Sequence, residues 1–548
     1  MTTTRTVLAG LVVACAVSAC GGRAPYWDTI VTAGASSVGM ANGVALVDDA
    51  DHRVVLLTAL ANQQLSARAL PVGHNVISQA TTTSPDGSFL FVLSSGDTPR
   101  RTEKDQFPSL TKFDASDFGW KSTTYTTTVA LPNLAIDPLG DPLSDWAVAY
   151  TGPGAPASFV QNANEIVIFD LTKPYSMSNP IAHTIRSQGG TPQRLTFTPR
   201  LNLAKVPGQG RLLIVETDID VTLVDLANPS SDVTVSLTSG TSAQQVTPAG
   251  LVVDSGFDST NPAAVPGPPR IALRAQNDRN IFTFTLAPSD TNDFTPIINV
   301  IDVGGTPTDI AFVRADQDVL RVAALVPSLS SAVLVDADTS ITTQVALPAP
   351  YSRLSLVTNV VGSATGTDVA MLWSGSAAGV ALWALGNTVG QPYHSIEVLP
   401  ITQQVQTVDE VTNQAQLKVL ETTDVSTSSG FLVLDLLKRT ASPLQTASKA
   451  TLAIAPDGLR MWAFAQGGTD LAKLDFSGPE ALNPVPLTTD KTIDAVYDVA
   501  RPSSAGGDGG RSLIAIHNQG TVGATVFNAL NPDTATARIV PALLLEGP

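Results

Sequence analysis

The chain has 548 residues, enough for one large core or for several domains. Charged residues make up 14% of it, hydrophobic residues make up 43%, and the formal net charge is −17. The high share of hydrophobic residues excludes extensive disorder, and the negative net charge excludes general nucleic-acid binding. There are two cysteines, which excludes a disulfide-stapled scaffold and a cysteine-ligated zinc site.

The N-terminal segment has the features of an export signal. Arg5 supplies a positive charge, and residues 7–17 form an apolar run that falls short of the roughly 20 residues needed to span a bilayer. The run ends in Val17-Ser18-Ala19-Cys20, which resembles the lipobox of bacterial lipoproteins. The resemblance implies that the Cys20 thiol receives a diacylglyceryl group, that the chain is cut before Cys20, and that the new amino terminus is acylated. The alternative is an ordinary signal peptide with a chance cysteine.

These features predict three parts of the chain. Residues 1–19 are a signal peptide, residues 20–25 hold the lipidated Cys20 and a short linker, and residues 26–548 form the body. Two or three acyl chains on one cysteine would make a durable membrane anchor. Gly21 and Gly22 follow Cys20 in place of Asp, which in the Gram-negative sorting rule favours the outer membrane. We therefore expect an exported protein held at the cell envelope through its lipid.

The body contains a repeated turn followed by an apolar strand. Ser84-Pro85-Asp86-Gly87 precedes one such strand, Ala455-Pro456-Asp457-Gly458 precedes another, and residues 136–140 form a weaker copy. Proline presets the backbone of the second turn position, and Asp-Gly accepts tight or left-handed geometry. These segments indicate β-turns that lead into buried strands.

A second mark follows each turn after about 20 residues, and it is an apolar strand that often closes with Asp. The closing positions fall near residues 58, 114, 170, 225, 285, 336, 385, 435, 475 and 528, which gives a mean period of about 52 residues. The segments between the marks are rich in Val, Thr, Ile and Leu, and no convincing amphipathic helix is present. A period of this length with about four strands is typical of a propeller blade.

The repeats resemble bacterial propeller repeats related to the WD40 and YVTN families. Gly304-Gly305-Thr306-Pro307 and Gly189-Gly190-Thr191-Pro192 look like the lead into the innermost strand of such repeats, although the Gly-His and Trp-Asp pairs of true WD40 repeats are absent. The resemblance implies an all-β fold, a β-propeller of about eight to ten four-stranded blades, in one ring or in two packed propellers. A β-solenoid or tandem sandwiches are the alternatives.

Five insertions interrupt the period, and loops on a repeat scaffold often carry function. Residues 94–109 and 151–164 are expected to connect second and third strands, whereas residues 199–211, 257–270 and 501–511 are expected to connect first and second strands. The two groups would then emerge on opposite faces. The first insertion holds the densest charge cluster of the chain, and we predict a partner contact at Arg100, Arg101, Glu103 and Lys104. The alternative is a tolerated surface insertion.

No catalytic or metal-binding motif is found, so the sequence predicts no catalytic residue, no metal site and no cofactor. The histidines are isolated in sequence: His52, His74, His183, His394 and His517. The acidic clusters do not match a calcium loop and are interpreted as solvated turns: Asp48-Asp49-Ala50-Asp51, Glu216-Thr217-Asp218-Ile219-Asp220, and Asp254 with Asp258. Four tryptophans lie in expected strands and are assigned to the core: Trp146, Trp373, Trp383 and Trp462.

We therefore expect a membrane-anchored envelope lipoprotein whose propeller is a non-catalytic binding or scaffolding module for a protein or a glycan. The main alternative is a propeller enzyme, similar to lactone hydrolases of the YVTN-like group, with a site in the central channel. A purely structural spacer is a third hypothesis. The expected partners are the membrane, through the lipid, and an envelope protein or glycan, but not nucleic acid.

Overall fold

The structure is a computed structural model that describes most of the chain from Ile30 to Leu545. The described ranges are 30–31, 34–81, 87, 89–97, 100–115, 120–138, 145–153, 162–203, 210–239, 244–257, 267–288, 294–315, 319–358, 367–385, 394–411, 414–423, 429–444, 450–476, 484–501 and 510–545. The predicted signal peptide, Cys20 and Trp27 lie outside these ranges. No helix of the described part is long and apolar enough to cross a membrane.

The described residues form antiparallel sheets in which consecutive strands pair with one another. The first three sheets are blades 1, 2 and 3. Their strands are β1 (Ser36–Met40), β2 (Gly43–Asp48), β3 (Arg53–Ala59), β4 (Leu65–Pro71), β5 (Val76–Thr81), β6 (Phe89–Ser94), β7 (Ser109–Asp114), β8 (Lys121–Thr126), β9 (Asn133–Ile136), β10 (Trp146–Tyr150), β11 (Glu165–Asp170) and β12 (Ile181–Thr184).

Blades 4, 5 and 6 repeat the pattern, with a small hairpin of β17 (Thr238–Ser239) and β18 (Gln244–Gln245) between blades 4 and 5. Their strands are β13 (Pro192–Phe197), β14 (Leu212–Thr217), β15 (Asp220–Asp225), β16 (Val233–Ser236), β19 (Pro248–Asp254), β20 (Arg270–Ala275), β21 (Asn280–Pro288), β22 (Phe294–Asp302), β23 (Asp309–Ala315), β24 (Val319–Val326), β25 (Ser331–Asp336) and β26 (Thr342–Ala346). Short 3-10 turns occur at η2 (Ala61–Gln63), η4 (Pro229–Ser231), η5 (Pro327–Leu329) and η6 (Thr534–Thr536).

Blades 7 and 8 share one long strand and so form a seven-stranded sheet. The beginning of β30 (Ile396–Glu410) pairs with β29, and its second half from Gln404 pairs with β31. The other strands of this sheet are β27 (Arg353–Thr358), β28 (Thr367–Trp373), β29 (Ala378–Ala384), β31 (Leu417–Thr423), β32 (Ser429–Asp435) and β33 (Thr440–Leu444). β30 is thus the fourth strand of blade 7 and the first strand of blade 8.

Blades 9 and 10 complete the set. Their strands are β34 (Thr451–Ile454), β35 (Arg460–Phe464), β36 (Asp470–Asp475), β37 (Val485–Thr488), β38 (Ala495–Ala500), β39 (Arg511–Gln519), β40 (Thr521–Asn528) and β41 (Arg538–Val540). The described residues therefore build ten blades, at the upper end of the predicted eight to ten. Each of the ten predicted strand marks is the third strand of one blade.

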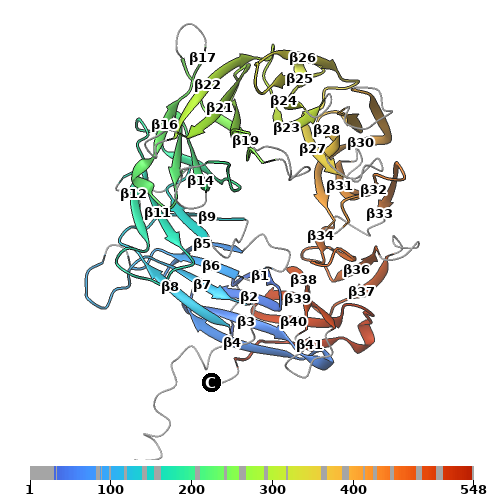
Figure 1. Ribbon diagram of the computed structural model, residues 1–548. Helices are drawn as coiled ribbons and strands as arrows, with labels where there is room; N and C mark the ends of the chain where they lie inside the picture. The colour runs from blue at the N-terminus through green and yellow to red at the C-terminus, as the bar shows by residue number, and fades with distance from the viewer. Residues whose placement is uncertain are drawn as a thin grey trace, which may run out of the picture.

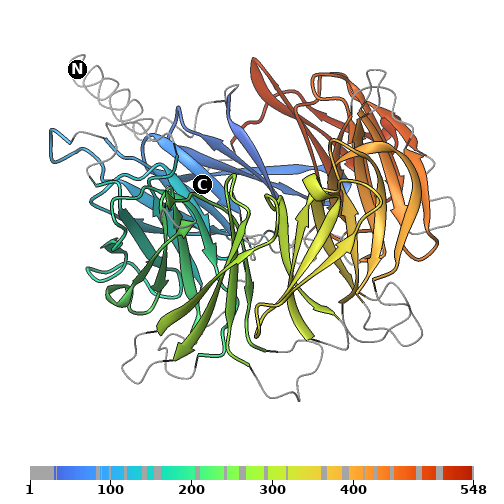
Figure 2. The ribbon, with the colours of Figure 1, turned by 90° about the horizontal axis from the view of Figure 1, so that it is seen from above.

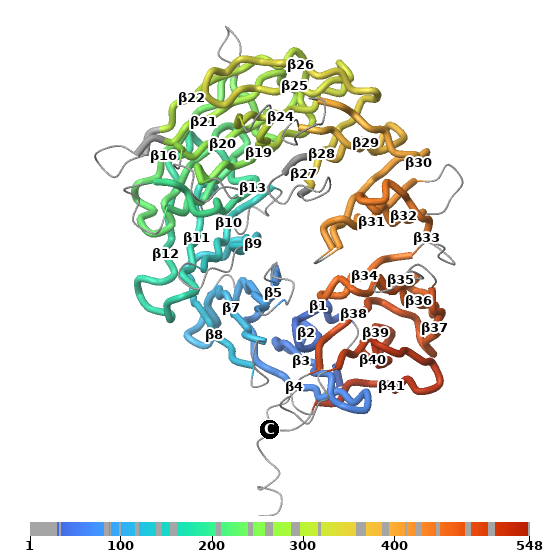
Figure 3. Tube along the Cα trace, turned by 45° about the vertical axis from the view of Figure 1, so that its right-hand side comes forward, coloured from blue at the N-terminus to red at the C-terminus, as the bar shows by residue number. Residues whose placement is uncertain are grey.

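The sheets are arranged in a ring with their first strands toward the centre and their fourth strands outside (Figures 1 and 3). The outer strands β8 and β12 are accordingly largely exposed, whereas every residue of the second strands β2 and β14 is buried. Seen after a 90° turn, the sheets stand side by side around the ring, each of them twisted (Figure 2). Blade 1 lies next to blade 10, so the first and last sheets meet.

The core of the described part is divided into ten apolar clusters, each between two neighbouring blades. Leu325 of blade 6 and the buried Trp383 of blade 7 belong to one of them, and Trp462 of blade 9 packs with Leu513 of blade 10 in another. At the seam, Leu46 of blade 1 packs with Ile514 and Ile516 of blade 10. The predicted core positions Trp146, Trp383 and Trp462 are buried, and Trp373 packs partly buried between blades 7 and 8.

Aspartates that close the third strands hold the turns to the fourth strands. The Asp336 carboxylate accepts hydrogen bonds from the backbone N–H groups of Asp338 and Thr339, and Asp435 does the same for Leu437 and Lys438. This local bonding is typical of Asp in turns, and it explains why the sequence mark so often ends in Asp.

The two Gly-Gly-Thr-Pro leads precede first strands, as predicted. Gly304 and Gly189 have positive φ angles of 84° and 101°, a conformation that suits glycine. Gly305 approaches the end of the second strand of its own blade so closely that an added Cβ would lie 2.8 Å from Ser328 Oγ and from Val326 Cγ1. Of the predicted turns, 455–458 is present with Gly458 N–H donating to the Ala455 carbonyl, whereas 84–86 lies outside the described residues.

The turns of the ring emerge on two faces. Because consecutive strands alternate in direction, the connections between second and third strands lie on one face, here called face A, where the first strands also begin. The connections between first and second strands lie on the opposite face B. As predicted, the insertions at 94–109 and 151–164 connect second and third strands, and those at 199–211, 257–270 and 501–511 connect first and second strands.

Candidate functional site

The predicted contact residues lie in the connection between β6 and β7 on face A, and the structure describes this loop apart from residues 98–99. Asp105 organises its middle: the carboxylate accepts hydrogen bonds from Arg101 N–H, Thr102 N–H and Thr102 Oγ1–H at 2.5, 2.8 and 2.6 Å. These bonds, that from the Thr102 hydroxyl above all, lower the pKa of Asp105. The described part of the loop is therefore ordered by its own side chains.

A second aspartate fastens the loop to the preceding blade connection. Asp97 accepts a hydrogen bond from Gln106 N–H at 2.8 Å and lies 3.1 Å from Nδ1 of His74. The bond from Gln106, followed by that from His74, lowers the pKa of Asp97. The His74 ring in turn stacks on His52, with 4.0 Å between the ring centroids. The two histidines, isolated in sequence, thus support the base of the loop.

The outer part of the loop presents an arginine stacked on an aromatic ring. Arg100 Cζ lies 3.7 Å from the centroid of the Phe107 ring, and Phe107 is 43% exposed. The stacking keeps a guanidinium and an aromatic face together at the surface. Beside them lies an open depression of about 360 Å³. It is lined by Arg100, Glu103, Lys104, Asp105, Phe107, residues 71–73 and the outer strand positions Thr124 and Thr126, among others.

The remaining predicted contact residues point their charges outward. Arg101, Glu103 and Lys104 are all exposed. The carboxylates of Asp97 and Asp105 are occupied by bonds within the loop base, so the free surface of the loop carries three cationic side chains and one anionic side chain. The structure thus brings Arg100, Glu103 and Lys104 together around one depression, and places Arg101 on the same loop. Their role as a partner contact stays a prediction.

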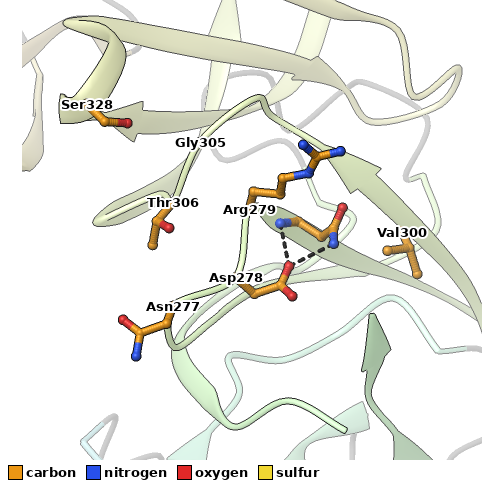
Figure 4. A pocket seen from close by; sticks show the side chains of 8 residues that line it. Asn277, Asp278, Arg279, Val300, Gly305, Thr306 and Ser328 are labelled. Atoms are coloured by element: carbon orange, nitrogen blue, oxygen red, sulfur yellow. Dashed lines mark hydrogen bonds between the residues drawn. The ribbon is translucent and has the colours of Figure 1, made fainter. Parts of the chain in front are cut away.

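A second depression, of about 630 Å³, lies on face A between blades 5 and 6 (Figure 4). The turn 277–280, Val300, Ser328 and the predicted lead residues Gly305 and Thr306 line it. Asp278 accepts hydrogen bonds from the backbone and side-chain N–H groups of Asn280, both at 2.7 Å. Arg279 forms an exposed ion pair with Asp302. The lining of this depression is mostly polar, and the side chains of Asp278, Arg279 and Asn280 already have partners.

The acidic clusters of the sequence make ion pairs and hydrogen bonds with other side chains. Asp48 and Asp51 hold the buried Arg53, Glu216 pairs with Arg194, and Asp220 accepts hydrogen bonds from Ser187 and Thr217. Asp48, Glu216 and Asp220 are buried, so they hold their blades together and are not the solvated acids of the prediction. Asp258 lies outside the described residues.

Among the described residues, no group of three or more His, Cys, Asp and Glu side chains is placed to hold a metal ion. The other histidines are spread over the ring. His517 is buried in β39, and His183 of β12 lies 3.4 Å from Asp232. The hydrolase site at the ring centre stays a prediction.

A group of charged side chains at the start of the inner strands forms no sequence motif. Arg194, Arg274 and Arg353, with Glu216 and Asp309, come from blades 4 to 7 and interact electrostatically. Their positions are spread over 160 residues of sequence, so no local motif reveals them. A sequence signal exists only once the blades are aligned. Arg194, Asp309 and Arg353 then all lie within the first three residues of first strands.

Comparisons with known proteins bear on the fold. No family model and no curated protein matches the sequence. Three similar solved structures are the dihydro-heme d1 dehydrogenase NirN (13% identity, 74% of this chain and 73% of that chain, TM-score 0.40), a eukaryotic initiation factor (9%, 83% and 95%, 0.45) and the WD40 domain of SCAP from fission yeast (10%, 83% and 95%, 0.35). With TM-scores below 0.5, the fold assignment rests on the sheets themselves.

Those sheets define the class of protein. Ten blades of sequential antiparallel strands, first strands inward and apolar clusters between all neighbours, are the architecture of a β-propeller. The chain is a β-propeller, and this class comprises binding modules, scaffolds and enzymes alike.

Proposed function

We propose that this propeller is a binding module of the bacterial cell envelope, anchored through lipid on Cys20, and that the loop 94–109 on face A contacts a protein partner. The lipobox-like Val17-Ser18-Ala19-Cys20 supports the anchor. The short linker after Cys20 would keep the ring close to the membrane surface. The outer membrane is the expected location.

The observation that carries the proposal is the internal order of the loop. Asp97 and Asp105 hold the backbone at residues 101, 102 and 106 before any partner arrives, and the Arg100–Phe107 stack stands exposed beside a depression. A preorganised loop loses little conformational entropy on binding. Arginine and aromatic side chains are also the residues that most often dominate binding energy at protein interfaces. A merely tolerated insertion has no need of either feature.

The anchor is tested by replacing the cysteine. Cys20→Ser should move the protein from the membrane fraction to the soluble fraction, because the thiol that accepts the lipid is gone. The matched control is Cys15→Ser, which lies inside the predicted signal peptide and should leave the protein in the membrane. Membrane retention of Cys20→Ser would refute the anchor.

The contact is tested by site-specific photo-crosslinking of the membrane-bound full chain. A crosslinker at Glu103 should give a discrete product with one partner protein, and the same crosslinker at the exposed Lys438, in the turn after β32 on face B, should not. Phe107→Ala should remove the product at Glu103, because it takes away the ring on which Arg100 stacks. Equal products from both positions, or a Glu103 product that Phe107→Ala leaves unchanged, would contradict the proposal.

A further inference from the structure

Five charged side chains gather where the first strands of blades 4 to 7 begin on face A. Arg194 lies in β13, Glu216 is its cross-strand partner in β14, Asp309 begins β23 and Arg353 begins β27. Arg274 lies in β20, paired with Gly250 of the inner strand β19. The strand β23, which begins with Asp309, contacts both β20 and β27, and Arg274 interacts electrostatically with the other four side chains, so the group spans four blades.

Both acids of this group are already satisfied by other partners. Glu216 is buried and accepts two hydrogen bonds from the Arg194 guanidinium. The Asp309 carboxylate accepts the backbone N–H groups of Ile310 and Leu354, each at 3.0 Å. Neither acid forms an ion pair with Arg274 or Arg353 among the described residues. The hydrogen-bond donors of the group that have no partner within it therefore belong to Arg274 and Arg353.

The missing side chain at Gly250 makes room for the Arg274 guanidinium. A Cβ on Gly250 would lie 2.7 Å from Arg274 Nε and 3.3 Å from its Cζ, so the guanidinium lies across the inner strand at the glycine. The side chain is half-buried, and burial lowers its pKa. Within the described part of the chain it makes no hydrogen bond or close ion pair. The guanidinium therefore keeps its N–H donors available for a ligand.

Arg353 adds a second unoccupied guanidinium to the group, and it is exposed. The five side chains of the group together carry a charge of +1, in a chain whose net charge is −17. A positive spot on an acidic protein focuses small anions toward itself. The planar guanidinium donates paired hydrogen bonds that match the two oxygens of a carboxylate or phosphate.

From this arrangement we propose that Arg274 and Arg353, with Arg194 beside them, bind the carboxylate or phosphate group of a small anionic ligand at the inner edge of face A. Arg274 of blade 5 and Arg353 of blade 7 are the two donors, on either side of blade 6. Arg194 is held by Glu216 and contributes its charge. The site is independent of the loop 94–109, which lies on another blade.

The test is calorimetric titration of the full chain with citrate and, in a separate arm, with inorganic phosphate. Saturable binding of citrate alone would mean that the site takes a carboxylate. Saturable binding of phosphate alone would mean that it takes a phosphorylated ligand. Arg274→Gln should weaken binding by about tenfold or more, the loss expected when a charge-assisted bidentate contact disappears. Gly250→Ala keeps every charge but displaces the Arg274 guanidinium, and it should weaken binding by roughly threefold to tenfold.

Arg279→Gln is the matched control, because it removes the same charge from the same face at the exposed pair with Asp302. It should change the affinity less than about twofold. If Arg274→Gln fails to fold, the exposed Arg353→Gln replaces it, with the same expectation. Absence of saturable binding by the unaltered protein in both arms up to about 10 mM, where affinity corresponds to under roughly 3 kcal/mol, would overturn the proposal. So would equal weakening by Arg279→Gln and Arg274→Gln.

Discussion

The Asp498 carboxylate connects blades 9 and 10. Its carboxylate, almost fully buried in β38, accepts hydrogen bonds from Trp462 Nε1 and Arg460 Nε of blade 9 at 3.0 and 3.1 Å, and from Arg511 of its own blade. Buried charges of this kind stabilise only when every member is present, because a single deletion leaves uncompensated charges inside.

Asp498→Ala should therefore lower the free energy of unfolding by about 3–5 kcal/mol. Chemical denaturation measured by tryptophan fluorescence checks this. Asp302→Ala is the matched control, because its pair with Arg279 is exposed on both sides and should contribute less than about 1 kcal/mol. Similar losses in the two variants would show that burial does not decide the contribution.

His517 predicts a pH dependence of stability. The ring is buried, with Nδ1 2.9 Å from the Thr492 carbonyl and Nε2 2.7 Å from Thr525 Oγ1, and burial lowers its pKa below the ordinary 6.5. As the pH falls, His517 binds a proton in the unfolded chain before it does so in the folded protein. Its contribution to the free energy of unfolding is therefore fully present above pH 6.5. It is lost as the pH falls from 6.5 to the lowered pKa of the folded state. Denaturation midpoints at pH 8 and pH 5.5 should show this loss. His517→Gln should reduce the difference between the two midpoints, and an unchanged difference would assign the loss to other groups.

At the scale of elements, the third strands were the most predictable part of the molecule. Their apolar runs end in Asp because Asp336, Asp435 and their equivalents bond the following turn, so a local physical need leaves a local mark. The shared strand β30 was not predictable, since its bend between two sheets depends on where β29 and β31 lie. The arginine group at the inner strands was hidden for the same reason: its members meet only through the ring.

The Gly-Gly leads give a prediction at this scale. Gly305→Ala should destabilise the protein by about 1–3 kcal/mol, because the new methyl group would press on Val326 and Ser328 at the end of the second strand. Gly267→Ala is the control, since a Cβ there meets nothing within 4 Å. Thermal melting of both variants checks the difference, and equal melting temperatures would mean that the lead yields without cost.

The ring closes without a strand from one end of the chain joining the sheet at the other end. Blade 1 and blade 10 each contain only consecutive strands, so the two sheets meet through contacts between them. The seam consists of a shared apolar cluster, the Tyr497 hydroxyl donating to Ser37 Oγ at 2.9 Å, and backbone bonds such as Ala500 N–H to the Ala41 carbonyl. The end of the chain takes part: Leu543 is buried at the seam, and its N–H donates to the Val522 carbonyl.

Leu543→Ala should consequently destabilise the protein by about 2–4 kcal/mol, an unusual cost for a position so near a terminus. Leu544→Ala is its control, because Leu544 is 68% exposed and should change stability by less than about 0.5 kcal/mol. Denaturant midpoints of the two variants decide the matter. Equal midpoints would exclude the C-terminal segment from the seam.

Closure of the ring is the claim on which the two faces and the proposed anion site depend, and one crosslink tests it directly. Ala41 of the first blade and Ala500 of the last blade are joined by a backbone hydrogen bond. In a chain that also carries Cys15→Ser and Cys20→Ser, the substitutions Ala41→Cys and Ala500→Cys would place two thiols within the reach of a disulfide. Mild oxidation should join them almost completely, as read by mass spectrometry of the linked peptides, whereas the pair Ala41→Cys with Ala311→Cys should stay reduced. Free thiols at positions 41 and 500 under the same conditions would contradict a closed ten-bladed ring.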